Sequence, residues 1–269
     1  MKYELGSLES KLVFTLEEKG SLYFTVDDAR QILNTSDETL WKILHKLAEK
    51  KRIQRIKKGH YLLIPAKAGY ETKWREEVTK FIDNMLKDED YYIGYWTALN
   101  LWHMTEQIPL TIFIATTKRK RKIIYDNTVP IQFITLKPRK FFGWTTKKIE
   151  DNRFNISNPE KTIIDSLDLP QYSGGISEIA DALRHPLDYT RLIEYADRLD
   201  NRAIHKRLGY LTQLLNLDIP EKTLTHLKHK ISSGYSWLDP TAPKIIYKYD
   251  SQWRLKINIP LDNLRSIHD

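Results

Sequence analysis

Residues 37–50 constrain the fold most strongly, because four aliphatic residues recur at helical spacing and most of the other positions are polar or charged. The four are Leu40, Ile43, Leu44 and Leu47, spaced at intervals typical of one helix face. This spacing predicts a helix with one face buried against a core. A single helix cannot supply its own core, so the neighbouring segments must pack against that stripe.

The segments before this helix predict two more helices. An apolar stripe over residues 8–16, which includes Phe14, indicates a helix that ends at Gly20. Thr25 with Asp28 three residues later has the spacing of a capping box, and a second helix is expected from there to Leu33. Residues 34–36, Asn-Thr-Ser, predict a turn into the third helix.

The segment after the third helix, "RIQRIKKGHYLLIP", predicts a hairpin of two β-prone arms around Gly59. Helix, strand, helix, turn, helix and hairpin in this order predict a winged helix-turn-helix over residues 1–68. Tyr61 and Leu63 are expected in its core, and Trp41 is expected at the edge of that core.

Residues 69–269 predict a second, larger domain, joined through a linker at residues 65–70. Helices are expected over 71–87, 97–103, 159–167, 176–183, 187–199, 202–217 and 221–232. β-prone runs occupy 110–117 and 129–136, and the pattern is extended again over 235–259. The helices and strands do not alternate regularly, so the expected fold class is mixed α/β.

Positive charge is concentrated in two windows. The chain of 269 residues has a formal net charge of +8. Residues 42–58 hold eight basic residues and one acid, and residues 118–148 hold ten basic residues and one acid, so the windows carry +7 and +9 and the remainder carries −8. Two concentrated cationic segments on an otherwise acidic chain favour a polyanionic partner.

The first window lies on the predicted third helix and hairpin. A helix fits the major groove of double-stranded DNA, and a cationic hairpin can contact the neighbouring phosphates. The side chains that we expect to contact DNA from the helix and the turn before it are Thr35, Ser36, Lys42, His45 and Lys46. From the hairpin they are Arg55, Lys57, Lys58 and His60.

The second window includes five consecutive cations directly after an apolar run. A charge run of this kind can be the solvated end of a strand, or half of a second basic surface for DNA phosphates or RNA. The residues of this predicted second surface are Lys118, Arg119, Lys120, Arg121, Lys122, Lys137, Arg139 and Lys140. Base stacking by Trp144 or by Phe141 and Phe142 is a less favoured addition.

The sequence does not favour an enzyme, a cofactor or a metal site. It contains no cysteine, no phosphate-binding glycine loop and no zinc-binding helix motif, and His226 and His229 lack a third ligand. A metal-dependent nuclease is the main alternative, with Asp165 as its candidate acid. However, Asp165 lies four residues after Lys161, the spacing of an ordinary ion pair within a helix. With no membrane-spanning run and no signal-peptide pattern, the expected location is the cytoplasm.

Several segments of the second domain resemble one family. In order, they are "YYIGYWTALNLWHMTEQIPLTIFIATTKRKRK", "FITLKPRKFFGW", "ISNPEKTIIDSLDLPQYSGGI", "KRLGYLTQLL" and "SWLDPTAP". Behind a predicted winged helix, they resemble the AbiEi family, the antitoxins of type IV toxin–antitoxin (abortive-infection) systems. The stretches Pro159–Thr162 and Ala115–Lys118 are the most specific, and the resemblance covers residues 5–260.

The resemblance implies a repressor that binds repeats in its own promoter through the N-terminal domain. It also implies a C-terminal domain that counteracts a nucleotidyltransferase-like toxin without forming a tight complex with it. By position, the third helix and the hairpin take the DNA-binding role, and the second basic surface matches the charged face of the C-terminal domain. A stand-alone DNA-binding regulator without a toxin remains open.

Overall fold

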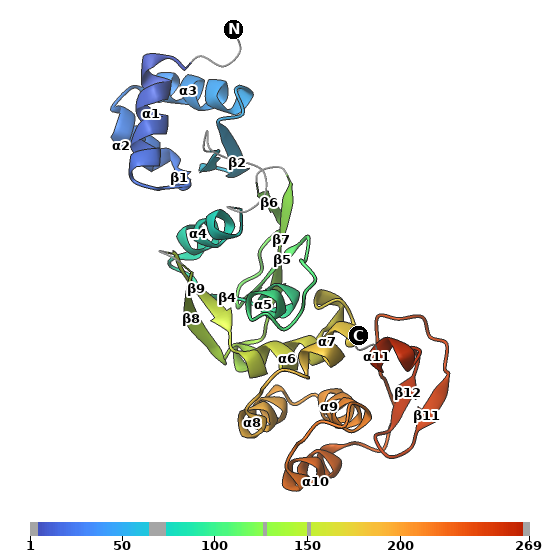
Figure 1. Ribbon diagram of the computed structural model, residues 1–269. Helices are drawn as coiled ribbons and strands as arrows, with labels where there is room; N and C mark the ends of the chain where they lie inside the picture. Colours follow the sequence, from blue (N-terminus) through green and yellow to red (C-terminus); the bar gives the residue numbers. More distant parts are fainter. Residues whose placement is uncertain (1–4, 65–73, 126–127, 150–151, 266–269) are drawn as a thin grey trace. The chain divides into compact units, whose positions relative to one another are not determined.

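The helices and strands of residues 5–64 occur in the expected order. The computed structural model describes residues 5–64, 74–125, 128–149 and 152–265. The first elements are α1 (Ser7–Glu18), β1 (Tyr23–Thr25), α2 (Val26–Leu33), α3 (Asp37–Glu49), β2 (Ile53–Lys57) and β3 (His60–Leu63) (Figure 1). The three strands form an antiparallel sheet in the order β1-β3-β2. The domain boundary predicted at residue 68 lies outside the described residues.

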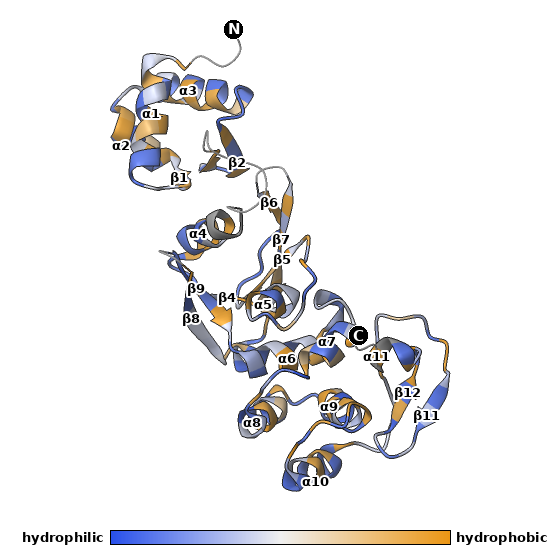
Figure 2. Ribbon diagram, viewed as in Figure 1, coloured by the Kyte–Doolittle hydropathy of each residue, from blue (hydrophilic) through white to orange (hydrophobic). Residues whose placement is uncertain are grey.

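The core of this segment is made by the predicted stripe of α3 together with α1, α2 and the sheet. All four apolar residues of that stripe are buried, as are Tyr61 and Leu63. Figure 2 shows apolar and polar residues interleaved along α3, as expected for a helix with one buried face. Two aromatic predictions were wrong: Phe14 is 61% exposed and Trp41 is 49% exposed.

The remaining elements mix short strands and helices, which confirms the predicted mixed α/β class. The strands are β4 (Tyr91–Ile93), β5 (Ile112–Thr116), β6 (Ile123–Tyr125), β7 (Val129–Thr135), β8 (Trp144–Ile149), β9 (Asn152–Ser157), β10 (Ser236–Trp237), β11 (Lys248–Asp250) and β12 (Leu255–Ile257). The helices are α4 (Trp74–Leu86), α5 (Tyr95–Leu101), α6 (Pro159–Asp168), α7 (Ile176–Ala182), α8 (Tyr189–Leu199), α9 (Arg202–Leu214), α10 (Glu221–Lys230) and α11 (Asp262–Arg265). No helix among the described residues has the length and apolar character needed to span a membrane.

The chain divides into two compact units that do not follow one cut in the sequence. The first unit comprises residues 1–90, 121–131 and 146–154, and the second comprises 91–120, 132–145 and 155–269. The larger sheet has the strand order β6-β7-β5-β4-β9-β8, and the C-terminal sheet has the order β10-β12-β11.

Helix α6 lies at the centre of the second unit. Asn158 caps its first turn by accepting a hydrogen bond from the Lys161 amide at 2.9 Å, and Pro159 is its first residue, as predicted. Every side chain from Glu160 to Leu167 is buried. Figure 1 shows α5 on one side of α6 and α8 and α9 on the other, and all three helices pack against it.

Candidate nucleic-acid interface

The polar face of α3 is exposed along its length. Ser36 caps the helix by accepting a hydrogen bond from the Thr39 amide at 3.4 Å, and Thr35 before it is half-buried. Lys42, His45 and Lys46 are all exposed. Because the opposite stripe is buried in the core, this face is the part of α3 that can meet a partner.

Two acids lie among these three side chains on the same face. The Lys42 ammonium is 2.6 Å from Glu38, and the His45 ring is 3.6 Å from Glu49, both one helical turn apart. All four side chains are at least 67% exposed. Such pairs contribute little to stability in water, so the cations can exchange these acids for phosphates.

The hairpin presents three cations on one arm and at its turn. Gly59 has a φ of +76°, a conformation that glycine adopts without strain. Arg55, Lys57 and Lys58 are exposed, and the strand register shifts between Arg55 and Lys57. These three side chains, which are predicted to contact phosphates, are therefore open to solvent.

His60 adds no positive charge to the hairpin. Its ring stacks on Tyr23 with the centroids 5.6 Å apart, and its Nδ1 forms a hydrogen bond with the Tyr23 hydroxyl. Burial, reinforced by the charge of Lys57, lowers the pKa of His60 below its ordinary value of 6.5. His60 is therefore uncharged at neutral pH and packs the base of the hairpin.

Two cations of the first window hold α1 to the core. The Lys50 ammonium is 2.5 Å from Glu9, and the Arg52 guanidinium is 3.2 Å from Glu17. Burial alone would raise the pKa of Glu9, but hydrogen bonds from Lys50 and the Gly6 amide lower it overall. The other six cations of this window are exposed, so most of its charge faces solvent.

Part of the second basic window lies beside the hairpin. The Gln54 side-chain amide in β2 donates a hydrogen bond to the Ile124 carbonyl in β6 at 2.8 Å. Arg121 and Lys122, which directly precede β6, are exposed and belong to the first unit. They therefore add two exposed cations next to strand β2 of the hairpin, a placement that spacing alone does not indicate.

The other residues of the predicted second surface belong to the second unit, whereas Lys147 and Lys148 at the end of the window belong to the first. The Leu136 amide donates to the Thr116 carbonyl at 2.8 Å, so the runs that start at Lys118 and at Lys137 leave neighbouring strands at the same edge. Lys118, Arg119 and Lys137 are exposed there, and Lys120 is half-buried.

The last two cations of the predicted second surface already face acids. Arg139 is 3.3 Å from Asp200 and is exposed, whereas Lys140 is 2.5 Å from Asp168 and is largely buried. The second oxygen of Asp168 accepts a hydrogen bond from the Asn201 side chain at 2.7 Å. Lys140 therefore holds the segment after β7 against α6. Arg139 and Asp200 are both exposed, so Arg139 is free to exchange Asp200 for a phosphate.

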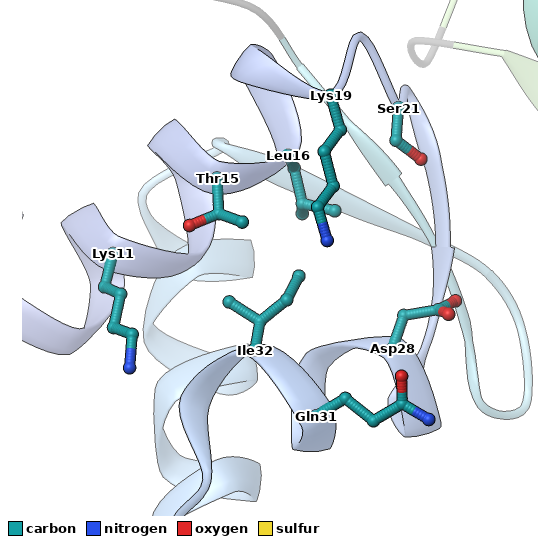
Figure 3. A pocket seen from close by; sticks show the side chains of 8 residues that line it. All are labelled: Lys11, Thr15, Leu16, Lys19, Ser21, Asp28, Gln31 and Ile32. Carbon is teal, nitrogen blue, oxygen red and sulfur yellow. The ribbon is translucent and has the colours of Figure 1, made fainter.

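A hollow of about 330 Å³ lies between α1 and α2 (Figure 3). Figure 3 shows Lys11 of α1 and Lys19, the residue directly after α1, on one side of it, and Asp28 and Gln31 of α2 on the other. No residue of α3 or of the hairpin lines it. Because none of the predicted DNA contacts lines this hollow, its two exposed lysines are useful controls.

The ion pair predicted between Lys161 and Asp165 occurs, but it lies in the core rather than on a helix surface. The two side chains are 0% and 3% exposed, and the Tyr92 hydroxyl donates to the other Asp165 oxygen at 2.7 Å. The Lys161 ammonium also lies 4.5 Å from the centre of the Phe142 ring. Burial raises the pKa of Asp165 and lowers the pKa of Lys161, because both charged forms lose their hydration.

Histidine and acid side chains also meet between α8, α9 and α10. Asp197 accepts hydrogen bonds from His205 at 2.8 Å and from His226 at 2.9 Å, and Lys230 lies 3.4 Å away. A carboxylate bonded to two imidazoles and an ammonium joins three helices. Within the ranges the structure describes, no group of three or more histidine or acidic side chains is arranged to hold a metal ion.

No protein-family model matches the sequence, and no curated protein matches it. Among solved structures, the chain is similar to the crystal structure of the RV2827C protein from Mycobacterium tuberculosis. The TM-score is 0.66 at 14% sequence identity, over 94% of this chain and 92% of that chain. At this identity the similarity concerns the fold alone, and it extends over nearly the whole chain.

Proposed function

We propose that the protein is a cytoplasmic DNA-binding regulator in which residues 5–64 act as a winged helix-turn-helix. The observation that supports this most directly is the exposed face of α3. It carries Lys42, His45 and Lys46 opposite a buried apolar stripe, and the cations of the hairpin follow directly in the chain.

The proposed contacts divide by chemistry. A helix about 10–12 Å across enters the major groove of B-DNA, where Lys42, His45 and Lys46 reach base edges or the adjoining phosphates. Lys57 and Lys58 at the hairpin turn contact phosphates, which fixes the position of α3 without reading sequence. Because Glu38 and Glu49 also lie on this face, some of the α3 cations must exchange partners on binding.

The regulatory role follows from the resemblance to the AbiEi family. Under this proposal, the protein represses its own promoter and its second unit counteracts a nucleotidyltransferase-like toxin. The exposed cations Lys118, Arg119 and Lys137, at one edge of the second unit, are the candidates for the antitoxic role. Co-expression with a neighbouring nucleotidyltransferase gene tests this role, and absence of such a gene favours the stand-alone regulator.

A gel-shift titration with the duplex upstream of the gene tests the DNA-binding role. Replacing Lys42 and Lys46 together with alanine should weaken binding at least about tenfold and lower the salt slope by up to about 1.8 if both contact phosphates. Lys57→Ala with Lys58→Ala should lower the slope equally and leave the preference over a random duplex unchanged.

The matched control is Lys11→Ala with Lys19→Ala, which removes the same charge from the hollow between α1 and α2. If the α3 variant and this control weaken binding equally, only net charge matters and the assignment of α3 is wrong. Glu38→Gln separates two further roles. Tighter binding to every duplex shows that Glu38 only neutralises Lys42, whereas an altered base preference shows that it reads sequence.

The divided basic run gives a second contrast. Arg121→Glu should weaken duplex binding because Arg121 lies beside the hairpin in the first unit. Arg119 belongs to the second unit, so Arg119→Glu should reduce antitoxicity while leaving repression in place. Equal loss of repression in both variants would contradict this division.

The alternative, a metal-dependent nuclease, is tested by incubating plasmid DNA and RNA with the protein and Mg²⁺. Asp165, its candidate acid, is buried, and both its oxygens face protein partners. Cleavage that needs Mg²⁺ and survives repurification of the protein would replace the regulatory proposal.

A further inference from the structure

The C-terminal sheet has one face buried and one face rich in aromatic and basic side chains. In its central strand β12, Leu255 and Ile257 are buried, and Lys256 between them points to the opposite face. The strand register pairs Lys256 with Trp237 of β10 and with Tyr249 of β11. Trp237, Lys256 and Tyr249 therefore lie side by side in one row across the outer face of the sheet.

Further aromatic rings lie on both sides of this row. Tyr235 packs edge-to-face against Tyr249 with the ring centroids 5.5 Å apart, and the Arg254 guanidinium lies 5.7 Å from the Tyr235 ring centre. Tyr247 lies two residues before Tyr249 on the same side of the chain, and its amide donates to the Ile257 carbonyl at 2.9 Å. We call these side chains the aromatic face; its members are Tyr235, Trp237, Tyr247, Tyr249, Arg254 and Lys256.

The rings of this face are open to solvent. Tyr247 is 59% exposed, Tyr249 is 55% exposed and Tyr235 is 37% exposed. The buried side of the same sheet is held by Trp253, which is 1% exposed. Folded proteins rarely gather several exposed aromatic rings unless the rings serve binding.

The charge of the aromatic face is positive. Residues 234–258 contain four cations, Lys244, Lys248, Arg254 and Lys256, and two acids, Asp239 and Asp250. Asp239 is buried and accepts a hydrogen bond from the Ile176 amide, and Asp250 accepts one from the Trp253 amide at 2.7 Å. Lys244 and Lys256 lie 4.9 Å and 5.0 Å from the Trp237 ring centre. The acids serve the fold, whereas Lys244, Arg254 and Lys256 lie beside the rings.

We propose that the aromatic face binds single-stranded nucleic acid. Unpaired bases stack on the Tyr247 and Tyr249 rings, and Arg254 with Lys256 neutralises the phosphates that follow them. A duplex cannot offer its bases in this way, because they are stacked on one another. A protein partner fits less well, because lysine is depleted in protein–protein interfaces and three basic residues, Lys244, Arg254 and Lys256, lie beside these rings.

This site is separate from the proposed duplex-binding surface. It lies in the second unit, whereas α3 and the hairpin lie in the first. Figure 1 shows β11 and β12 side by side near α11 at the end of the chain. The two sites can therefore be tested independently in the full-length protein.

The test is fluorescence anisotropy with labelled oligo(rU) and oligo(dT) of about 12 nucleotides at low salt, about 50 mM. Replacing Tyr247 and Tyr249 together with alanine should weaken binding at least about tenfold, because each stacked base contributes a factor of this order. Replacing both with phenylalanine keeps the rings and should retain binding. Tighter binding of oligo(rU) identifies contacts to the 2′-hydroxyl, and equal binding identifies stacking with phosphate contacts; both support the proposal.

Two controls separate this site from the duplex-binding surface. Phe14→Ala removes another exposed ring, on α1, and should leave oligonucleotide binding unchanged. Lys42→Ala with Lys46→Ala should also leave it unchanged, while the tyrosine variants keep their affinity for the upstream duplex. The proposal is overturned if the wild-type protein binds neither oligonucleotide, or if the paired alanine variant binds as wild type; the latter is also the result expected for a protein-docking face.

Discussion

Replacing Gly209 with alanine tests how the C-terminal sheet is fixed to the helices of the second unit. Gly209 lies in the middle of α9, where a glycine normally weakens a helix. A β-carbon added there would lie 2.1 Å from the Trp253 ring. Carbon atoms normally approach to about 3.5–4.0 Å, so the ring would have to move by more than 1 Å. The glycine therefore makes room for the tryptophan.

The sign of the change depends on two opposing effects. Alanine favours a helix over glycine by about 1 kcal/mol, which would stabilise the variant. Against this, Trp253 is 1% exposed and donates a hydrogen bond to Gln213 at 2.5 Å, so it cannot move without losing packing and that bond. Overpacking costs about 1–3 kcal/mol and the hydrogen bond contributes about 1 kcal/mol. We expect a net loss of about 2 kcal/mol in the free energy of unfolding.

Urea unfolding followed by tryptophan fluorescence measures this loss, and thermal unfolding should show a fall in Tm of about 4–8 °C. The matched control is Gly234→Ala, because a β-carbon at Gly234 would meet nothing within 4 Å. Trp253→Leu should lower the stability of the Gly209→Ala variant by less than it lowers that of the wild type, because in the variant it also relieves the clash with the new β-carbon. A Gly209→Ala protein as stable as wild type would refute the reasoning.

Two further predictions concern buried charges. Asp165→Asn leaves the Lys161 ammonium in the core without its counter-charge and should lower the free energy of unfolding by about 3–5 kcal/mol. Lys161→Met with Asp165→Leu removes both charges and should retain most of the wild-type stability. Urea unfolding of the wild type and the two variants measures the difference. Glu9→Gln removes a carboxylate whose pKa is lowered in the folded protein. The ionised carboxylate stabilises the fold above pH 4.5, and this stabilisation is lost as the pH falls through the pKa of Glu9 in the folded state. The stability difference from wild type should therefore shrink between pH 7 and pH 3, and a constant difference would show that the ion pair with Lys50 contributes nothing.

The predictions that held come from local patterns with a short-range cause. The stripe of α3, the Thr25 capping box and the Asn158 cap with Pro159 each depend on neighbours within one helical turn. For this reason the structure places them where the sequence indicates. Trp41 shows the limit of such patterns, because hydrophobicity alone assigned a half-exposed ring to the core edge.

Burial of charged groups could not be predicted from spacing. Lys161 and Asp165 have the separation of a surface ion pair, and their sequence neighbours are compatible with one. They are buried because α6 is covered by other helices on several sides, a tertiary property. The apolar residues Ile163, Ile164 and Leu167, which lie between and just after the pair, are a local signal that could have indicated it.

The run Lys118–Lys122 shows why a cluster of charge in a sequence is not yet a site. Its five cations are consecutive, but Lys118, Arg119 and Lys120 belong to the second unit and Arg121 and Lys122 to the first. Hydrogen bonds at the two ends tie them to different partners, since the strand before the run bonds to Leu136 and the strand after it bonds to Gln54. Five consecutive cations therefore need not act together, because the fold divides them between two units, and the separate roles proposed for Arg119 and Arg121 depend on this division.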